Sequence, residues 1–102
     1  MKKITLICAA GMSTSLMVTK MKEAAKKLGM EVEIRATSES KFKQYENDTD
    51  ILLLGPQVGF LLNKYKQTYE PKGIKVEVID SIDYGMMNGE KVLKNALGIQ
   101  SM

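Results

Sequence analysis

Histidine and tryptophan are absent from this chain of 102 residues, which also contains only one cysteine and two prolines. The absence of histidine removes the commonest general base and the commonest metal ligand in proteins. Serine–histidine catalysis and zinc chemistry are therefore excluded, and we expect no metal and no cofactor. Any chemistry that the chain performs must use sulfur, carboxylate, hydroxyl or backbone groups.

Long apolar runs are missing as well. No segment approaches the roughly 20 apolar residues that a helix needs to cross a bilayer, and the pattern of a secretory signal peptide is not visible. The lone Cys8 cannot form an internal disulfide, and its place at the end of an apolar segment is typical of a protein kept in a reducing compartment. We therefore expect a cytoplasmic protein that does not itself span a membrane.

The charge of the chain is weakly positive and evenly distributed. There are 15 basic and 12 acidic residues, and the lysines are spread along the whole sequence. Nucleic-acid binding normally requires a basic patch interleaved with aromatic residues, so we expect no nucleic-acid partner. The length fits one domain over residues 1–102, which we expect to be a monomer.

Hydrophobic periodicity predicts strands that alternate with helices. Apolar or alternating runs predict strands at residues 2–7, 31–37, 50–55 and 73–80, and apolar residues at helical spacing predict helices at about 14–28, 38–48, 57–68 and 89–98. This alternation implies parallel β-α-β units with right-handed crossovers. We predict an α/β fold, a single-domain open sandwich with a four-stranded parallel sheet in the order 2-1-3-4 and helices on both faces.

The segment "TLICAAGMSTSLM" contains the cysteine at the end of the first predicted strand. A strand ending in Cys8, a turn on Gly11 and a helix started by Ser13, Thr14 or Ser15 would direct backbone N–H groups at the sulfur. Such a loop binds anions and lowers the pKa of a thiol. A cysteine in this position is more often a small buried hydrophobic residue, but the glycine and the three hydroxyl residues favour an anion-binding loop.

Two other connections should lie beside this loop, because ligands of open α/β sheets bind beyond the carboxyl ends of the strands. Gln57 follows the third predicted strand, and Asp80 and Tyr84 follow the fourth. Each has a purely structural alternative. Gln57 can simply begin a helix, Asp80 can cap one, and Tyr84 can pack in the core, just as the three hydroxyl residues can serve only as helix caps.

The segments "CAAGMSTSLMV", "LLLGPQV" and "VEVIDSIDYG" together resemble the enzyme IIB component of the bacterial phosphoenolpyruvate-dependent sugar phosphotransferase system, of the lactose and cellobiose/chitobiose type. The resemblance implies that Cys8 accepts a phosphoryl group from a phosphohistidine of enzyme IIA. It also implies that the group passes to a sugar, such as cellobiose or chitobiose, entering through the membrane component enzyme IIC. The implied phosphate-binding loop consists of Ala9, Ala10, Gly11, Met12, Ser13, Thr14 and Ser15.

The same loop also resembles that of low-molecular-weight tyrosine phosphatases, in which a cysteine is followed after five residues by arginine and then serine or threonine. Here Thr14 stands at the arginine position and Ser15 follows it. Threonine cannot reproduce the bidentate donation with which arginine holds the equatorial phosphate oxygens. The loop therefore favours a phosphocarrier, while a phosphatase-like hydrolase and a non-catalytic module that binds an anion or a partner remain as alternatives.

Overall fold

A four-stranded parallel sheet forms the centre of the molecule. The computed structural model describes residues 2–7 and 11–98, and for residues 11–14 it describes the backbone alone. The strands are β1 (Lys2–Ile7), β2 (Val32–Thr37), β3 (Ile51–Leu54) and β4 (Lys75–Val78). Their order across the sheet is β2-β1-β3-β4, and each neighbouring pair is parallel. The predicted strand order 2-1-3-4 is confirmed.

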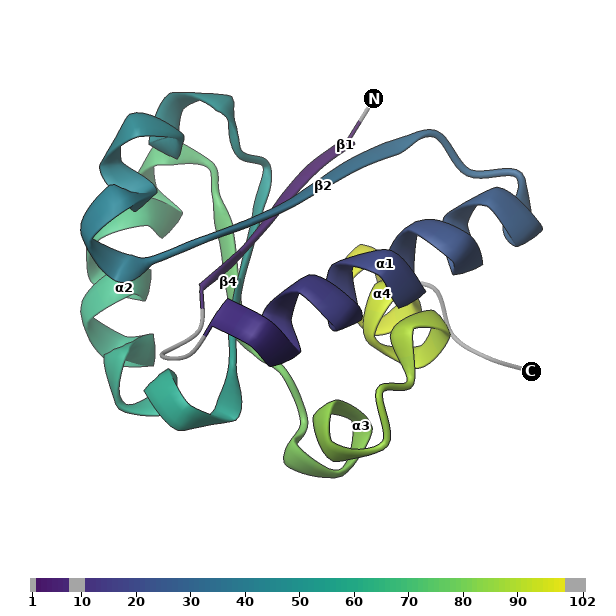
Figure 1. The fold of residues 1–102 in the computed structure, drawn as a ribbon. Coiled ribbons are helices and arrows are strands. Elements are labelled where there is room, and N and C mark those ends of the chain that lie inside the picture. Colours follow the sequence, from purple (N-terminus) through teal and green to yellow (C-terminus); the bar gives the residue numbers. More distant parts are fainter. Residues whose placement is uncertain (1, 8–10, 99–102) are drawn as a thin grey trace.

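Helices cover both faces of the sheet (Figure 1). The α-helices are α1 (Gly11–Leu28), α2 (Leu62–Tyr69), α3 (Ser81–Gly85) and α4 (Gly89–Leu97), and the 3-10 helices are η1 (Glu39–Gln44), η2 (Glu46–Asp48), η3 (Pro56–Leu61) and η4 (Glu70–Lys72). Helices α1, α3 and α4 lie on one side of the strands, and α2 lies on the other side (Figure 1). The predicted open sandwich is therefore confirmed.

The two central strands are apolar because both of their faces are covered. Alternate side chains of β1 and β3 belong to two separate cores. Ile4, Leu6, Ile51 and Leu53 pack with α1 and α4, whereas Ile7, Leu52 and Leu54 pack with Phe42, Tyr65 and Tyr69 on the opposite face. The second core is rich in aromatic rings, and Phe42 contacts Tyr69 edge to face with 5.2 Å between ring centroids.

The segments after the strands differ from the prediction. Residues 38–48, expected as one helix, form the 3-10 helices η1 and η2, in which Phe42 alone among their residues is buried. The helix expected over residues 57–68 begins as the 3-10 helix η3, whose start is fixed by Pro56 and whose regular geometry is broken at Val58 (φ −116°, ψ 21°). Because η1 and η2 bury Phe42 alone, residues 38–48 have little packing to enforce a longer α-helix.

Candidate functional site at the carboxyl edge of the sheet

The four strands end in one row. Ile7 is paired with Thr37 on one side and with Leu54 on the other, and Leu54 is paired with Val78. Each of these residues is the last of its strand. Because parallel strands run in the same direction, the connections that follow all leave from this edge, where ligands of open α/β sheets bind.

Backbone hydrogen bonds hold two of these connections against the sheet. The Gly55 N–H donates to the Ile7 carbonyl at 2.8 Å, and the Ile79 N–H donates to the Leu54 carbonyl at the same distance. The first bond links the start of the connection after β3 to the last residue before Cys8. The strand end at Ile7 and the segments beginning at Gly55 and Ile79 thus lie side by side.

Helix α1 begins closer to β1 than the sequence predicted. The expected turn on Gly11 and helix start near Thr14 are corrected, because Gly11 is itself the first residue of α1. A glycine and a methionine can both adopt helical dihedral angles. The first N–H groups of any α-helix have no acceptor within the helix. The N–H groups at the start of α1, in the segment from Gly11 to Thr14, therefore lack intrahelical partners, and the helix dipole favours an anion at this end.

The central residue of the predicted site, Cys8, lies outside the described residues, as do Ala9 and Ala10. Of the predicted loop, Gly11, Met12, Ser13, Thr14 and Ser15 lie in the first turns of α1. Three residues separate the end of β1 at Ile7 from the start of α1. The phosphate contacts of the loop residues therefore stay predictions.

Asp80 is placed as a helix cap. Its Oδ1 accepts a hydrogen bond from the Ile82 N–H at 2.8 Å and from the Asp83 N–H at 3.3 Å, at the start of α3. A carboxylate in this position satisfies two of the unpaired donors of the first turn. The structure thus gives Asp80 the structural role that the sequence offered as its alternative, one residue beyond the buried Ile79.

Tyr84 is buried in the core between the sheet and helices α1 and α4. It is buried together with Met17 and Met21 of α1. The neighbouring Asp83 is also buried and pairs with the ammonium of Lys91 at 3.3 Å. Sequence reasoning missed Asp83, although its spacing of three residues from Asp80 is the spacing of a helix cap and the first-turn residue that faces it.

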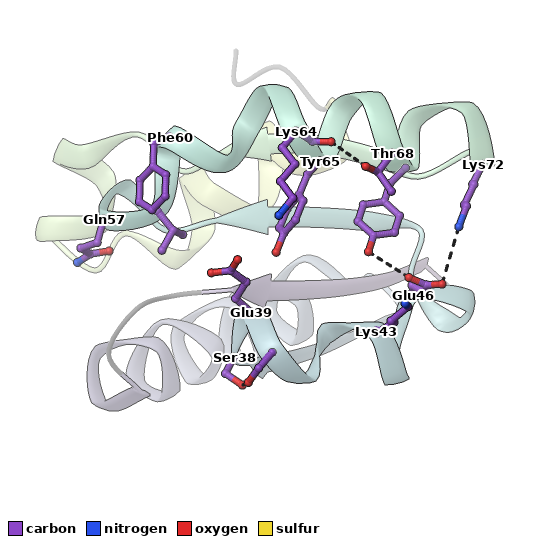
Figure 2. A pocket seen from close by; sticks show the side chains of 13 residues that line it. Ser38, Glu39, Lys43, Glu46, Gln57, Phe60, Lys64, Tyr65, Thr68 and Lys72 are labelled. Atoms are coloured by element: carbon purple, nitrogen blue, oxygen red, sulfur yellow. Dashed lines mark hydrogen bonds and ion pairs between the residues drawn. The ribbon is translucent and has the colours of Figure 1, made fainter.

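Gln57 is exposed in η3, at one end of a groove of about 850 Å³. Segments η1 and η2 form one wall of this groove, and η3 and α2 form the other (Figure 2). Five charged side chains line it: Glu39, Lys43, Glu46, Lys64 and Lys72. The groove was not predicted, because its two walls are distant in sequence and neither carries a recognisable motif.

Two tyrosines form the floor of the groove, and both have a pKa above the usual value for tyrosine. Burial together with a hydrogen bond to Glu46 (Oη to Oε2, 3.0 Å) raises the pKa of Tyr69 to about 12. Burial, and then the charge of Glu39, raises the pKa of Tyr65. Both hydroxyls are therefore protonated at neutral pH and can donate hydrogen bonds.

Several large apolar side chains are exposed on segments that begin at the carboxyl edge. They are Leu16 of α1, Phe60 of η3 (79% exposed), Ile82 of α3 (68% exposed) and Met86, which directly follows α3 (73% exposed). Within the described residues no cluster of carboxylates has the geometry of a metal site, and no helix among them is long and apolar enough to cross a bilayer.

Comparison with known proteins gives a consistent result. The family model described as "PTS system, Lactose/Cellobiose specific IIB subunit" matches residues 3–95. The oligo-beta-mannoside-specific EIIB component of Bacillus subtilis is 46% identical over 99 residues, which are 97% of this chain and 96% of that protein. The galactose-specific and cellobiose-specific EIIB components of Lactococcus lactis are each 46% identical over 100 residues, covering 93% of both chains.

Solved structures agree with this comparison. The solution structure of the cellobiose-specific IIB component from Borrelia burgdorferi has a TM-score of 0.77 at 40% identity and covers 95% of this chain and 89% of that one. The lactose-specific IIB domain from Streptococcus pneumoniae has a TM-score of 0.85 at 19% identity over 98% of each chain. A YwlE mutant from Bacillus subtilis (TM-score 0.59, 14% identity, 92% and 95% coverage) shares only the fold.

Proposed function

Because this chain belongs to the lactose/cellobiose-specific IIB family of the phosphoenolpyruvate-dependent phosphotransferase system, we propose that its Cys8 carries a phosphoryl group from enzyme IIA to a sugar. The thiolate attacks the phosphorus of an enzyme IIA phosphohistidine, so that an S–P bond forms as the N–P bond breaks. The imidazole departs as the leaving group and takes up a proton. A sugar hydroxyl bound by enzyme IIC then attacks the phosphorus and releases the thiolate, and its proton passes to a base on that partner.

The observation that carries this proposal is the position of Cys8 in the chain. It directly follows Ile7, which ends β1 in the row of strand ends, and it precedes the first turn of α1 by two residues. The helix dipole and the unpaired N–H groups of that turn favour both a thiolate and the oxygens of a phosphoryl group bound to it. Histidine, the usual alternative acceptor, is absent from the chain.

The direct test is phosphorylation by the donor cascade. Enzyme I, the phosphocarrier protein, enzyme IIA and phosphoenolpyruvate should raise the intact mass of the chain by one phosphoryl group. The variant Cys8→Ser should not be labelled at this site. Thr19→Ala is a suitable control, because it removes an exposed hydroxyl from α1 outside the predicted loop and retains the thiol. Equal labelling of Cys8→Ser and of the unmodified chain would overturn the assignment.

A second measurement separates a carrier from a hydrolase. Thr14 occupies the position at which the phosphatase loop carries arginine, and loss of one well-placed donor in such a site costs about 10²- to 10³-fold in rate. We therefore expect negligible turnover of p-nitrophenyl phosphate and a phosphorylated form that persists until sugar-loaded enzyme IIC is added. Steady hydrolysis that disappears in Cys8→Ala would favour the hydrolase.

The partner surfaces should lie around Cys8, in the cytoplasm. Exposed apolar side chains on three segments that begin at the same edge, including Leu16, Phe60 and Ile82, supply the contact area that docking requires. Sugar identity is a separate question, because relatives named for oligo-beta-mannosides, galactose and cellobiose are equally identical to this chain. We propose a β-linked disaccharide, as the first and third of those names suggest.

A further inference from the structure

The groove beside α2 carries a hydrogen-bonding group that faces its open space, the hydroxyl of Tyr65 (Figure 2). The Tyr65 ring is only 6% exposed, and its hydroxyl has no hydrogen-bond partner among the described residues. Tyr69, which lies one turn further along α2, is satisfied by Glu46. Since no buried side-chain polar atom of the described residues lacks a partner, the Tyr65 hydroxyl is open to the groove, where a ligand can accept its hydrogen bond.

The groups facing this hydroxyl define what the ligand must offer. Figure 2 shows the Glu39 carboxylate directed toward Tyr65 from the opposite wall, and the Lys64 ammonium directed into the groove beside it. The hydroxyl and the ammonium donate hydrogen bonds, and the carboxylate accepts them. A ligand that fits must therefore both accept and donate hydrogen bonds.

The charges of the groove argue against a simple ion. Three lysines and two glutamates line it, and Glu46 already pairs with Lys72 at 3.8 Å. An inorganic anion bound near Tyr65 would face the Glu39 carboxylate, and a cation would face Lys64. A neutral group rich in hydroxyls avoids both repulsions, because each hydroxyl can donate to the carboxylate and accept from the ammonium.

The end of the groove near Gln57 adds an apolar surface. Phe60 is 79% exposed and lines this end, where Figure 2 places it close to Gln57. A pyranose ring has an apolar face of C–H groups that packs against an aromatic ring, while its hydroxyls point sideways. A groove of about 850 Å³ is also within the range of small-molecule sites.

We propose that this groove binds a neutral carbohydrate of the size of a disaccharide, through hydrogen bonds to Tyr65, Glu39 and Lys64 and packing on Phe60. This proposal does not depend on phosphoryl transfer at Cys8. We expect weak binding, with a dissociation constant of roughly 1 mM. A site of this affinity would be occupied only when the sugar is abundant.

The test is a titration of the full chain with cellobiose, followed by the backbone amide signals in nuclear magnetic resonance spectra. We expect saturable shifts at residues lining the groove, such as Ser40 and Thr68. Tyr65→Phe, which removes only the hydroxyl, should weaken binding about three- to tenfold. Tyr45→Phe is the matched control, since Tyr45 does not line the groove. Glu39→Ala alters an exposed residue and provides a second weakening variant if Tyr65→Phe folds poorly.

Three outcomes would overturn the proposal. The first is no saturable shift with cellobiose, or equal affinity in all the variants. The second is shifts at the same residues with inorganic phosphate but not with cellobiose, which would make the groove an anion site. The third is shifts that appear only when enzyme IIA is added, which would make it a protein contact. No phosphoryl donor is present, so the result is independent of whether Cys8 is phosphorylated.

Discussion

Substitution of Gly89 by alanine tests how closely α4 must approach α1. Gly89 is buried at the start of α4, and a Cβ atom there would lie 2.5 Å from the Lys20 carbonyl carbon and 2.6 Å from the Met21 nitrogen. Carbon atoms in contact are normally about 3.5–4.0 Å apart. The two helices would therefore have to separate by roughly 1 Å, and because the obstacle includes backbone atoms it cannot be relieved by rotating one side chain.

Overpacking of this kind typically costs about 1–3 kcal/mol, and the backbone contact places Gly89→Ala near the upper end. For a domain of this size, a loss of about 2–3 kcal/mol lowers Tm by roughly 10–20 °C. Urea unfolding followed by circular dichroism measures the change. Gly85→Ala is the control, because a Cβ at Gly85 meets nothing within 4 Å. A stability of Gly89→Ala within about 0.5 kcal/mol of the unmodified chain would refute this account of the packing.

Three further predictions concern single side chains. Asp80→Ala should lose about 0.5–2 kcal/mol in urea unfolding, because two N–H groups of α3 lose their acceptor, while Asp80→Asn should keep most of the stability. The pKa of Tyr69 is raised from 10.0 to about 12, so its contribution to stability should be fully present below pH 10 and lost as pH rises through 12. Unfolding curves measured at alkaline pH should show this loss in the unmodified chain and not in Tyr69→Phe. Ile82→Ser should change stability by less than about 0.5 kcal/mol yet slow labelling of Cys8 by enzyme IIA; an unchanged labelling rate would contradict a docking role.

Much of the fold follows from apolar patterning. Strand β3 is a continuous apolar run, and β1 is apolar from Ile4 onward except for Thr5, because helices cover both faces of these strands. This pattern predicts a buried parallel sheet. The segments that were predicted poorly, residues 38–48 and the start of η3, bury few side chains. Their geometry is decided by local features, such as Pro56 and the anchoring of Phe42, which carry little periodic signal.

The edge from which the connections after β3 and β4 leave the sheet was predictable, but the roles of their polar residues were not. The order of the strands, together with the rule that ligands bind at their carboxyl ends, placed Cys8, Gln57 and Asp80 at one edge. Which polar residues face solvent, and which are engaged in structure, depends on tertiary packing: Asp80 caps α3, and Tyr84 fills the core. The groove at Tyr65 could not be predicted, because its walls, η1 and α2, are distant in sequence and meet only in the folded chain.

Helix α3 shows how a short helix can be held in place without using its exposed side chains. Five residues are too few for a helix to be stable alone, so α3 depends on three anchors that all point inward or toward its start: the Asp80 cap, the Asp83–Lys91 ion pair and the buried Tyr84. Of Ile82, the Asp80 cap uses only the backbone N–H, and none of the anchors involves the side chains of Ile82 and Met86, which extend into solvent. The side chains that fix the position of α3 are thus distinct from those available to a partner. We therefore expect Asp80→Ala to impair phosphoryl transfer by loosening α3, in proportion to the stability that the substitution removes. Asp80→Asn, which keeps the cap, should then transfer normally. A direct contact of Asp80 with the phosphoryl group would instead reduce transfer in Asp80→Asn as well.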